Sequence, residues 1–493
     1  MLARLPNLLK EMASSFVFLR FPRELRDMVY EHYSTVAGGY VCDSQSFLGG
    51  KLRGARDSSR RIDLDLIFTC RQVAAETKGL PFRANTVTFQ TIASRDIGVD
   101  AAQFDFMVRH VESKQNCLFR FSAPYVPSEA HDELKRRYPQ FAPLLDYRRA
   151  DRRIHRSYPR QNSYGEAPSV YRELYKDTLQ AVSLCDPATL FIMRDSWPGS
   201  KNALRTLTSP IHDWSIPSQG DMSRLFSYLD EEHKVMATER QSKLGGTDPD
   251  SRVSAAAVAI YFIGSLPAAS RMQLRDVVLD EDHKAVALPE CHGRGLVPLC
   301  QKNPQLRVQR RLNLWENFFS AGKTVHSHET FVRQMTESVS RWMVEARALP
   351  SAGMPAGSFS LLLDGSGPVS QHFHHVFQSI VQRHAAWQLA WTASQDRREP
   401  DPLALSWCER RGGEECYRTE YTGYFYEDFP AAMRDVGEDD PGSIVRCNFD
   451  VGKPWDIGSS IPGHQNWGVF RWNDEWKSQD SQWWHMVSSF CTN

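Results

Sequence analysis

The glycine-rich stretches are the first residues in this chain that could carry chemistry, because such loops can hold a phosphate group. Asp364–Pro368 lies between an apolar strand-like run and a helical pattern, where phosphate loops occur. It lacks the third glycine of a dinucleotide fingerprint and the lysine of a P-loop, and Gly365-Ser366-Gly367 is not a Gly-x-Ser-x-Gly nucleophile elbow. Gly322-Lys323-Thr324 ends like a P-loop, but Asn317 stands where its first glycine is required. A turn is therefore the prediction at Asp364–Pro368, and a P-loop at Gly322–Thr324 is rejected.

Histidine and cysteine are the other residues whose spacing could indicate a reactive site. His372 and His375 would share one face of a helix, as a metal-binding pair does. No Glu-x-x-His partner or paired cysteines accompany them, so we predict no metal and no cofactor. Cys291 and His292 could be a nucleophile and its base, but adjacent side chains usually point apart. We predict a protein that is not an enzyme, with an enzyme using the Gly365–Gly367 loop as an alternative.

Composition limits the classes of partner. The 493 residues contain 59 basic and 59 acidic side chains, so no global field favours nucleic acid or an anionic membrane. The ten cysteines include no Cys-x-x-Cys pair, which indicates reduced thiols. The longest apolar run, 255–264, is far shorter than the ~20 residues of a membrane helix. We therefore expect a soluble protein of the cytoplasm or nucleus, with no membrane and no nucleic-acid partner.

Two short helices near the N-terminus are predicted from apolar spacing. The first begins at Pro22, which suits an early helical position. The second covers 63–79, with Asp63 or Asp65 as its cap and Gly79 at its end. Neither is long enough to be stable alone, so the two should pack on each other.

These helices carry a resemblance to a known family. Phe21-Pro22-x-Glu24-Leu25 followed by Cys70-Arg71-Gln72-Val73 resembles the F-box pattern, and is closest to the F-box-like modules of filamentous fungi. Those modules read Leu-Pro-x-Glu-Leu-Arg-x-x-Ile-Tyr, then Leu-x-x-Cys-Arg-Gln-x-x-x-Glu, and the strand 85–89 that follows here also fits them. Phe21 replaces the usual leucine, and no tryptophan follows Cys70.

The resemblance implies docking onto a Skp-type adaptor of a cullin-based ubiquitin ligase. An interface of this kind rests on a few apolar anchors. The expected partner-binding residues are Phe21, Pro22, Leu25, Met28, Val29, Leu66, Cys70 and Val73. The function expected from the resemblance is a non-enzymatic adaptor that recognises a further, unidentified protein target. The alternative is a fungal protein–protein interaction module with no role in ubiquitin transfer.

The fold class expected is mixed α/β. Alternating patterns predict helices at 253–272, 296–301, 329–347 and 369–391, with strands at 276–280, 305–314 and 358–363. Such alternation favours parallel crossover units, and the spacing between the strands, about 31 and 53 residues, excludes regular leucine-rich repeats. We predict an irregular α/β domain, for which a curved repeat-like array is one form.

The chain is predicted to divide into six segments. A segment at 122–168 is rich in Arg, Tyr and Pro, and is interpreted as a disordered insertion rather than a phosphate-tracking arm. The aromatic residues of the last segment are interpreted as packing on the body rather than as a recognition surface. The segments are an N-terminal extension (1–17), an F-box-like module split by a loop insertion at 34–61 (18–92), a connecting segment (93–121), the insertion (122–168), the α/β domain (169–395) and the docked aromatic-rich region (396–493).

Overall fold

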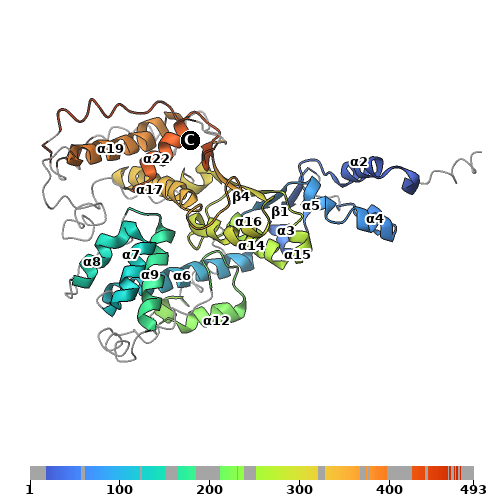
Figure 1. Cartoon of the computed structure of the whole chain (residues 1–493), viewed down its shortest axis with the longest axis horizontal. Helices are drawn as coiled ribbons and strands as arrows, with labels where there is room; N and C mark the ends of the chain where they lie inside the picture. The colour runs from blue at the N-terminus through green and yellow to red at the C-terminus, as the bar shows by residue number, and fades with distance from the viewer. Residues whose placement is uncertain are drawn as a thin grey trace, which may run out of the picture.

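The structure is a computed structural model (Figure 1). It describes residues 18–56, 62–122, 125–150, 165–184, 211–229, 231, 233–237, 251–319, 328–366, 374–375, 377–396, 425–438, 442–464, 466–467, 471, 474–475 and 478. The two halves of the chain meet in one sheet, because strands from residues 40–90 pair with strands from residues 276–447.

A seven-stranded sheet organises the molecule, with strand order β2-β1-β3-β4-β5-β6-β7. All neighbours are parallel except β1 and β2, which are antiparallel. The strands are β1 (Tyr40–Cys42), β2 (Arg53–Gly54), β3 (Val87–Gln90), β4 (Asp276–Glu281), β5 (Arg307–Asn313), β6 (Phe359–Asp364) and β7 (Val445–Cys447). The α/β class is therefore confirmed, and β4, β5 and β6 lie where alternation predicted them.

The main core lies on one face of this sheet. Alternate residues of the strands, such as Val277, Leu279, Val308 and Leu312, are buried against helices, whereas their neighbours face the other way. The crossovers that cover the buried face contain α14 (Ala255–Ser265), the 3₁₀ segment η6 (Pro289–Leu296), α16 (Val297–Lys302), α17 (His328–Arg347), the π-helix η9 (Phe377–Gln382), α19 (Arg383–Asp396) and α22 (Phe429–Glu438). Since β1 and β3 to β7 follow one another in sequence across the sheet, it is wound in one direction.

The predicted helix at 253–272 is interrupted. Helix α14 ends at Ser265, Leu266 is extended, and α15 (Ala268–Arg271) begins after Pro267. Proline has no amide hydrogen, and it disfavours helical backbone in the residue before it. The predicted helix at 369–391 corresponds, within the described residues, to η9 and α19.

A buried ion pair joins the sheet to the helices above it. Glu281 at the end of β4 accepts hydrogen bonds from the Ala255 and Ala256 amides at the start of α14, and from Arg310 of β5 at 2.6 Å. The Arg310 guanidinium lies 4.3 Å from the ring centre of Trp342 in α17. Both charges are thus compensated inside the core, as buried charges must be.

The predicted boundary at residue 92 is not a boundary of the fold. Strands β1 and β2 come from the segment interpreted as a loop insertion, and β3 pairs with β4 of the body. What projects from the sheet is a smaller helical arm: α2 (Arg23–Ser34), the 3₁₀ turn η2 (Asp65–Phe68), α4 (Arg71–Glu76) and α5 (Leu80–Ala84), with a 3₁₀ turn η1 (Phe18–Arg20) before them (Figure 1). A short helix, α3 (Ser44–Leu48), connects β1 to β2.

The expected disordered insertion at 122–168 is instead folded over residues 125–150. Helices α7 (Ser128–Arg137) and α8 (Ala142–Ala150), joined by the turn η4 (Pro139–Phe141), pack against α6 (Arg95–Ser122) and α9 (Pro168–Ser183). Their buried residues include Leu134, Phe141, Leu144 and Leu145. These four helices form a lobe below the sheet in Figure 1, with α12 (Gln219–Ser227) beside it. The arginines of 151–164 lie outside the described residues.

The described residues of the C-terminal region, from 425 onward, contribute to the body. Phe425 and Tyr426 are buried, α22 packs on α17 and α19, and β7 forms an edge of the sheet. Trp467 packs beside Ala390 and Trp391 of α19. Among the described residues, we found no helix with both the length and the apolar character that a membrane span requires.

Candidate partner-docking site

The arm is held by a polar cluster inside it rather than by an apolar seam. Arg26 of α2 donates to both carboxylate oxygens of Glu76 in α4, from Nε at 3.0 Å and from Nη2 at 2.6 Å. The hydroxyl of Tyr30, one turn along α2, donates to Glu76 Oε2 at 2.7 Å. Arg26 and Tyr30 are buried. The face of α2 that meets α4 is thus its polar face.

The charge state of this cluster follows from these contacts. Hydrogen bonding from Arg26 lowers the pKa of Glu76 to about 2, so Glu76 is a carboxylate at neutral pH. Desolvation by burial, with Glu76 as its hydrogen-bond acceptor, raises the pKa of Tyr30 to about 12, so its hydroxyl keeps its proton. One carboxylate therefore accepts from two fixed donors, which sets how α2 is rotated relative to α4.

The same cluster places the chain that enters α2. Arg26 Nη1 donates to the carbonyl oxygen of Leu19 at 3.2 Å and to that of Phe21. Phe18 packs edge-to-face on Tyr30, with 5.4 Å between ring centres. Pro22 precedes the first helical residue and makes no side-chain cap. These contacts hold the chain before α2 from the inner side of the arm, and Phe21 and Pro22 remain exposed.

An apolar stripe on α2 consequently faces outward. Leu25, Met28 and Val29 are 49%, 66% and 49% exposed, and Phe21 one turn earlier is 39% exposed. These positions recur at helical spacing and form one continuous strip of the helix. An exposed strip of large apolar side chains, backed by a polar interior, is typical of a protein-docking surface.

The second helix of the predicted pair differs from the expectation. Asp63 accepts from the Asp65 amide and starts only η2, and a separate helix α4 begins at Arg71. Cys70 caps α4, its sulfur accepting from the Val73 amide at 3.5 Å.

The predicted site residues divide accordingly. Phe21, Pro22, Leu25, Met28, Val29 and Cys70 are exposed, Leu66 is half-buried, and Val73 is buried. Val73 is therefore wrong as a contact residue, because its side chain packs inside the arm. Leu66 lies next to the end of α2, where its amide is 3.4 Å from the hydroxyl of Tyr33.

Sequence reasoning missed two kinds of residue here. Phe68, 80% exposed on η2, was not recognised as a surface residue. Arg26, Tyr30 and Glu76 were not recognised as the interior of the arm, although Glu76 occupies the final position of the Cys-Arg-Gln-x-x-x-Glu pattern. That glutamate was the available signal, because a buried carboxylate requires donors opposite it.

The arm is attached to the sheet at defined points. The buried Asn85 side chain donates to the carbonyls of Ser34 and Pro81 and accepts from the Val36 amide at 2.7 Å. Gly79 has a φ of +73°, and a Cβ there would lie 2.2 Å from Gln273 Cγ of the body. The end of α2 and the start of α5 are therefore fixed against the start of β3 and the body.

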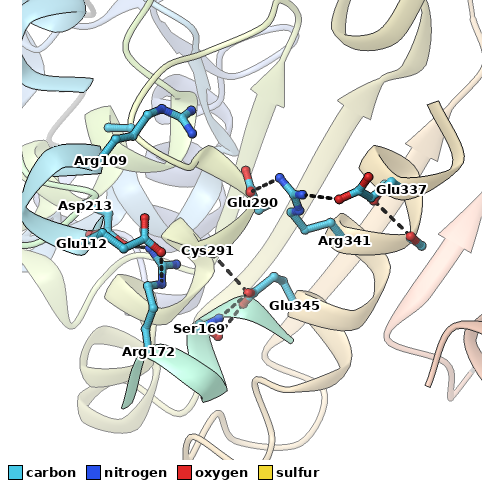
Figure 2. Close-up of polar contacts among 12 residues, drawn as sticks. Arg109, Glu112, Ser169, Arg172, Asp213, Glu290, Cys291, Glu337, Arg341 and Glu345 are labelled. Carbon is cyan, nitrogen blue, oxygen red and sulfur yellow. Dashed lines mark hydrogen bonds and ion pairs between the residues drawn. The ribbon is translucent and has the colours of Figure 1, made fainter. Parts of the chain in front are cut away.

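A second polar cluster lies between the helical lobe and the sheet (Figure 2). Arg172 of α9 donates to Asp213 at 2.7 Å, and Arg341 of α17 contacts Glu337 at 3.0 Å and Glu290 at 3.4 Å. Glu345 accepts from the amide of Ser169 at 2.7 Å and from its hydroxyl at 2.5 Å. Every charge in this list has a partner of opposite sign or a hydrogen-bond donor. The cluster joins α9 to α17.

The same region contains the Cys291-His292 pair, whose side chains have different partners. Cys291 donates to Glu345 at 3.3 Å, and burial raises the pKa of its thiol well above the ordinary value. Burial lowers the pKa of His292 to about 4, so its neutral ring accepts from the Ser254 hydroxyl at 2.6 Å and donates to the Ala287 carbonyl at 2.7 Å. Ser254 is completely buried and caps α14. The contacts of Cys291 and His292 stabilise the fold and do not activate Cys291 as a nucleophile.

The remaining sequence candidates form local contacts where they are described. At the glycine-rich loop, the Gly365 amide donates to Asn448 and the Ser366 amide donates to Asp364, so neither amide is directed at a ligand. His374 contacts the Asp450 carbonyl at 3.1 Å. His372, Gly367 and Gly322–Thr324 lie outside the described residues. Over the described part of the chain, no three histidine, cysteine or carboxylate side chains converge as metal ligands.

The outward stripe of α2 is therefore the best-defined candidate site in the described residues. Its geometry comes from the Arg26–Glu76 cluster beneath it, and its exposure is set by the arm's projection from the sheet. Comparison with known proteins adds no family assignment: no protein-family model matches the chain, and no curated protein or solved structure is significantly similar to it.

Proposed function

We propose that this protein is an F-box-like adaptor that docks onto a Skp-type subunit of a cullin ubiquitin ligase through its helical arm. The observation that supports this most directly is which side of α2 faces inward. The polar side with Arg26 is buried, and the apolar side with Leu25 and Met28 is exposed. The exposed strip coincides with the Phe-Pro-x-Glu-Leu motif that carries the resemblance. The protein itself performs no chemistry in this proposal, and acts in the cytoplasm or nucleus.

The energetic argument rests on a few anchors. Truncating one well-desolvated apolar anchor typically costs roughly 2 kcal/mol or more of binding free energy. Phe21, Leu25, Met28 and Val29 supply four neighbouring side chains that a partner can desolvate. A charge placed in the middle of this strip would have to be buried without a partner on docking, so it should abolish binding.

The experiment is copurification of a Skp-type adaptor with the full chain, using a bona fide F-box protein as the positive control. The test variants are Leu25→Glu and Met28→Glu. Their matched controls are Leu184→Glu and Met236→Glu, which introduce the same change at exposed apolar residues outside the arm. Binding by wild type and by the controls, with loss in the two arm variants, is expected. Circular dichroism should show all five proteins folded.

Two other outcomes would contradict the proposal. If wild type captures no adaptor while the positive control does, the protein is not a ligase adaptor. An interaction module without a ubiquitin role would then be the better assignment. If the adaptor binds all variants equally, the docking surface lies elsewhere than on α2.

A further inference from the structure

Asn85 lies where the helical arm joins the sheet, and its side chain binds three backbone groups from different segments. Its Nδ2 atom donates to the carbonyl of Ser34, the last residue of α2, at 2.7 Å, and to the carbonyl of Pro81 in α5 at 2.8 Å. Its Oδ1 atom accepts from the Val36 amide at 2.7 Å. The two hydrogens and the oxygen of the Asn85 side-chain amide are all used by these contacts.

The two carbonyls that Asn85 binds belong to the ends of helices. The last carbonyls of a helix have no partner within that helix and must find a donor outside it. Asn85 is 4% exposed and Ser34 is 6% exposed, so an unpaired carbonyl here would cost free energy. One side chain reaches both carbonyls only when the two helix ends lie side by side. The contacts of Asn85 therefore define how the end of α2 is placed against α5.

The same place is where the two connections of the arm enter neighbouring strands. Residues 35–39 lead from α2 into β1, and residues 85–86 lead from α5 into β3. The Tyr40 amide at the start of β1 donates to the Thr86 carbonyl at 2.9 Å, so the two connections meet side by side. Asn85 consequently ties α2 to a segment that continues directly into the sheet.

This tie acts on the direction of α2 and not on its apolar stripe. The stripe occupies the first two turns of α2, whereas Ser34 is the last residue of the helix. The rotation of α2 relative to α4 is set by the Arg26–Glu76 ion pair, which does not include Asn85. The docking surface and its direction relative to the body thus depend on different residues.

We propose that Asn85 is a positioning residue that holds α2 in one direction relative to the sheet. A partner docked on the apolar stripe is then held in a fixed place relative to the body. The inference rests on the proposed function in one respect, namely that this partner is a ligase adaptor. With that partner, Asn85 sets where a target bound by the body lies relative to the adaptor.

The experiment measures the distance between two spin labels in the full chain by double electron–electron resonance. The labels are attached to an encoded keto amino acid at Glu31 of α2 and at Tyr261 of α14, both exposed, so the ten cysteines stay in place. Wild type should give one narrow distance distribution. Asn85→Ala should give a distribution roughly two-fold broader, because two carbonyls and one amide lose their partner. Asn85→Asp keeps the acceptor for the Val36 amide but loses the two donors, and gives the same test if Asn85→Ala does not fold.

Asn303→Ala is the matched control for the loss of a buried asparagine. Asn303 is also 4% exposed, and its Nδ2 donates to the carbonyls of Arg271 and Leu274 in the body at 3.0 and 2.9 Å. Its replacement should lower the melting temperature but leave the distance distribution narrow. A folded Asn85 variant with the wild-type distribution, or a wild type that is already as broad as the variants, would refute the positioning role.

Copurification of a Skp-type adaptor separates this inference from the proposed function. Folded Asn85→Asp should capture the adaptor as well as wild type does, because the stripe and the Arg26–Glu76 pair are unchanged. Loss of capture in folded Asn85→Asp would contradict the inference, because Asn85 would then shape the docking surface itself. If wild type captures no adaptor but the distance distributions differ as expected, the proposed function fails and the positioning role of Asn85 stands.

Discussion

Arg26 and Glu76, fifty residues apart in sequence, form a two-point ion pair that joins α2 to α4 with nitrogen–oxygen distances of 2.6 and 3.0 Å. This pair occupies the position where an apolar seam would be expected between two amphipathic helices. Because the interior of the arm is polar, the apolar side of α2 is left at the surface.

Replacing Glu76 with Gln should loosen α2 and remove the acid sensitivity of the arm. The folded-state pKa of Glu76, about 2, lies below its ordinary value of 4.5, so its contribution is present above pH 4.5 and is lost as pH falls toward 2. Hydrogen exchange of the α2 amides should show protection in wild type at pH 5 to 7 that declines below about pH 4.5.

The Glu76→Gln variant should show weaker protection with little pH dependence in that range. Glu31→Gln, at an exposed position of the same helix, is the control and should behave like wild type. Equal exchange in wild type and Glu76→Gln would mean that the ion pair does not hold the arm.

His292 should make the body sensitive to mild acid. Its folded-state pKa of about 4 lies below its ordinary value of 6.5, so its contribution is full above pH 6.5 and is lost as pH falls through 6.5 toward 4. The shift corresponds to roughly 3 kcal/mol across that window. Protonation would remove the acceptor that His292 Nδ1 provides for the Ser254 hydroxyl. This contact lies near Ala287 and Leu288, each of which has a φ of 61°, in the left-handed region.

The measurement is urea unfolding at pH 7, 5.5 and 4.5. His292→Gln should be less stable than wild type at pH 7, and the difference should shrink as pH falls. The half-exposed His283 provides the control, since His283→Gln should follow the wild-type curve. A constant difference between wild type and His292→Gln at all three pH values would contradict a buried neutral imidazole.

The two faces of β5 should respond differently to substitution. Leu312 is fully buried in the main core, so Leu312→Asp would bury a carboxylate without a donor and should cost more than about 3 kcal/mol. The Arg311 side chain is 40% exposed and lies 4.0 Å from Asp364, so Arg311→Ala should cost less than about 1 kcal/mol. Denaturant melts of both variants test this, and similar costs would overturn the assignment of the covered face.

Residues 125–150 should be required for a stable lobe, contrary to what composition indicated. Phe141 is completely buried among α6, α7, α8 and α9, so Phe141→Ala should cost about 3–5 kcal/mol. Glu133→Ala on the exposed face of α7 removes only a surface pair with Arg136 and should change stability by less than about 1 kcal/mol. Thermal unfolding compares the two, and an unchanged melting temperature in Phe141→Ala would restore the interpretation of a dispensable insertion.

The strands of the body could be read from sequence because their pattern is local. Residues 305–314 alternate between apolar and polar side chains except at Arg310, and alternation has only one structural meaning when one face of a strand is buried. The sequence shows Asn85 and Gly79 of the arm, but it does not show which residues they contact. Asn85 bonds to Ser34, and Gly79 lies against Gln273, which depends on how the arm meets the sheet.

The sequence by itself determined that residues 23–34 form a helix with one apolar stripe, since helical spacing of Leu25, Met28 and Val29 is a property of the chain alone. Only the tertiary structure decided which side of that helix faces inward. An apolar stripe gains free energy by burial only if the surface opposite it is also apolar. Here α4 presents the carboxylate of Glu76, which accepts hydrogen bonds from Arg26 and Tyr30 on the polar side of α2. In the same way, alternation defined two faces for each strand, but the packing of the described helices on the sheet decided which face became the main core.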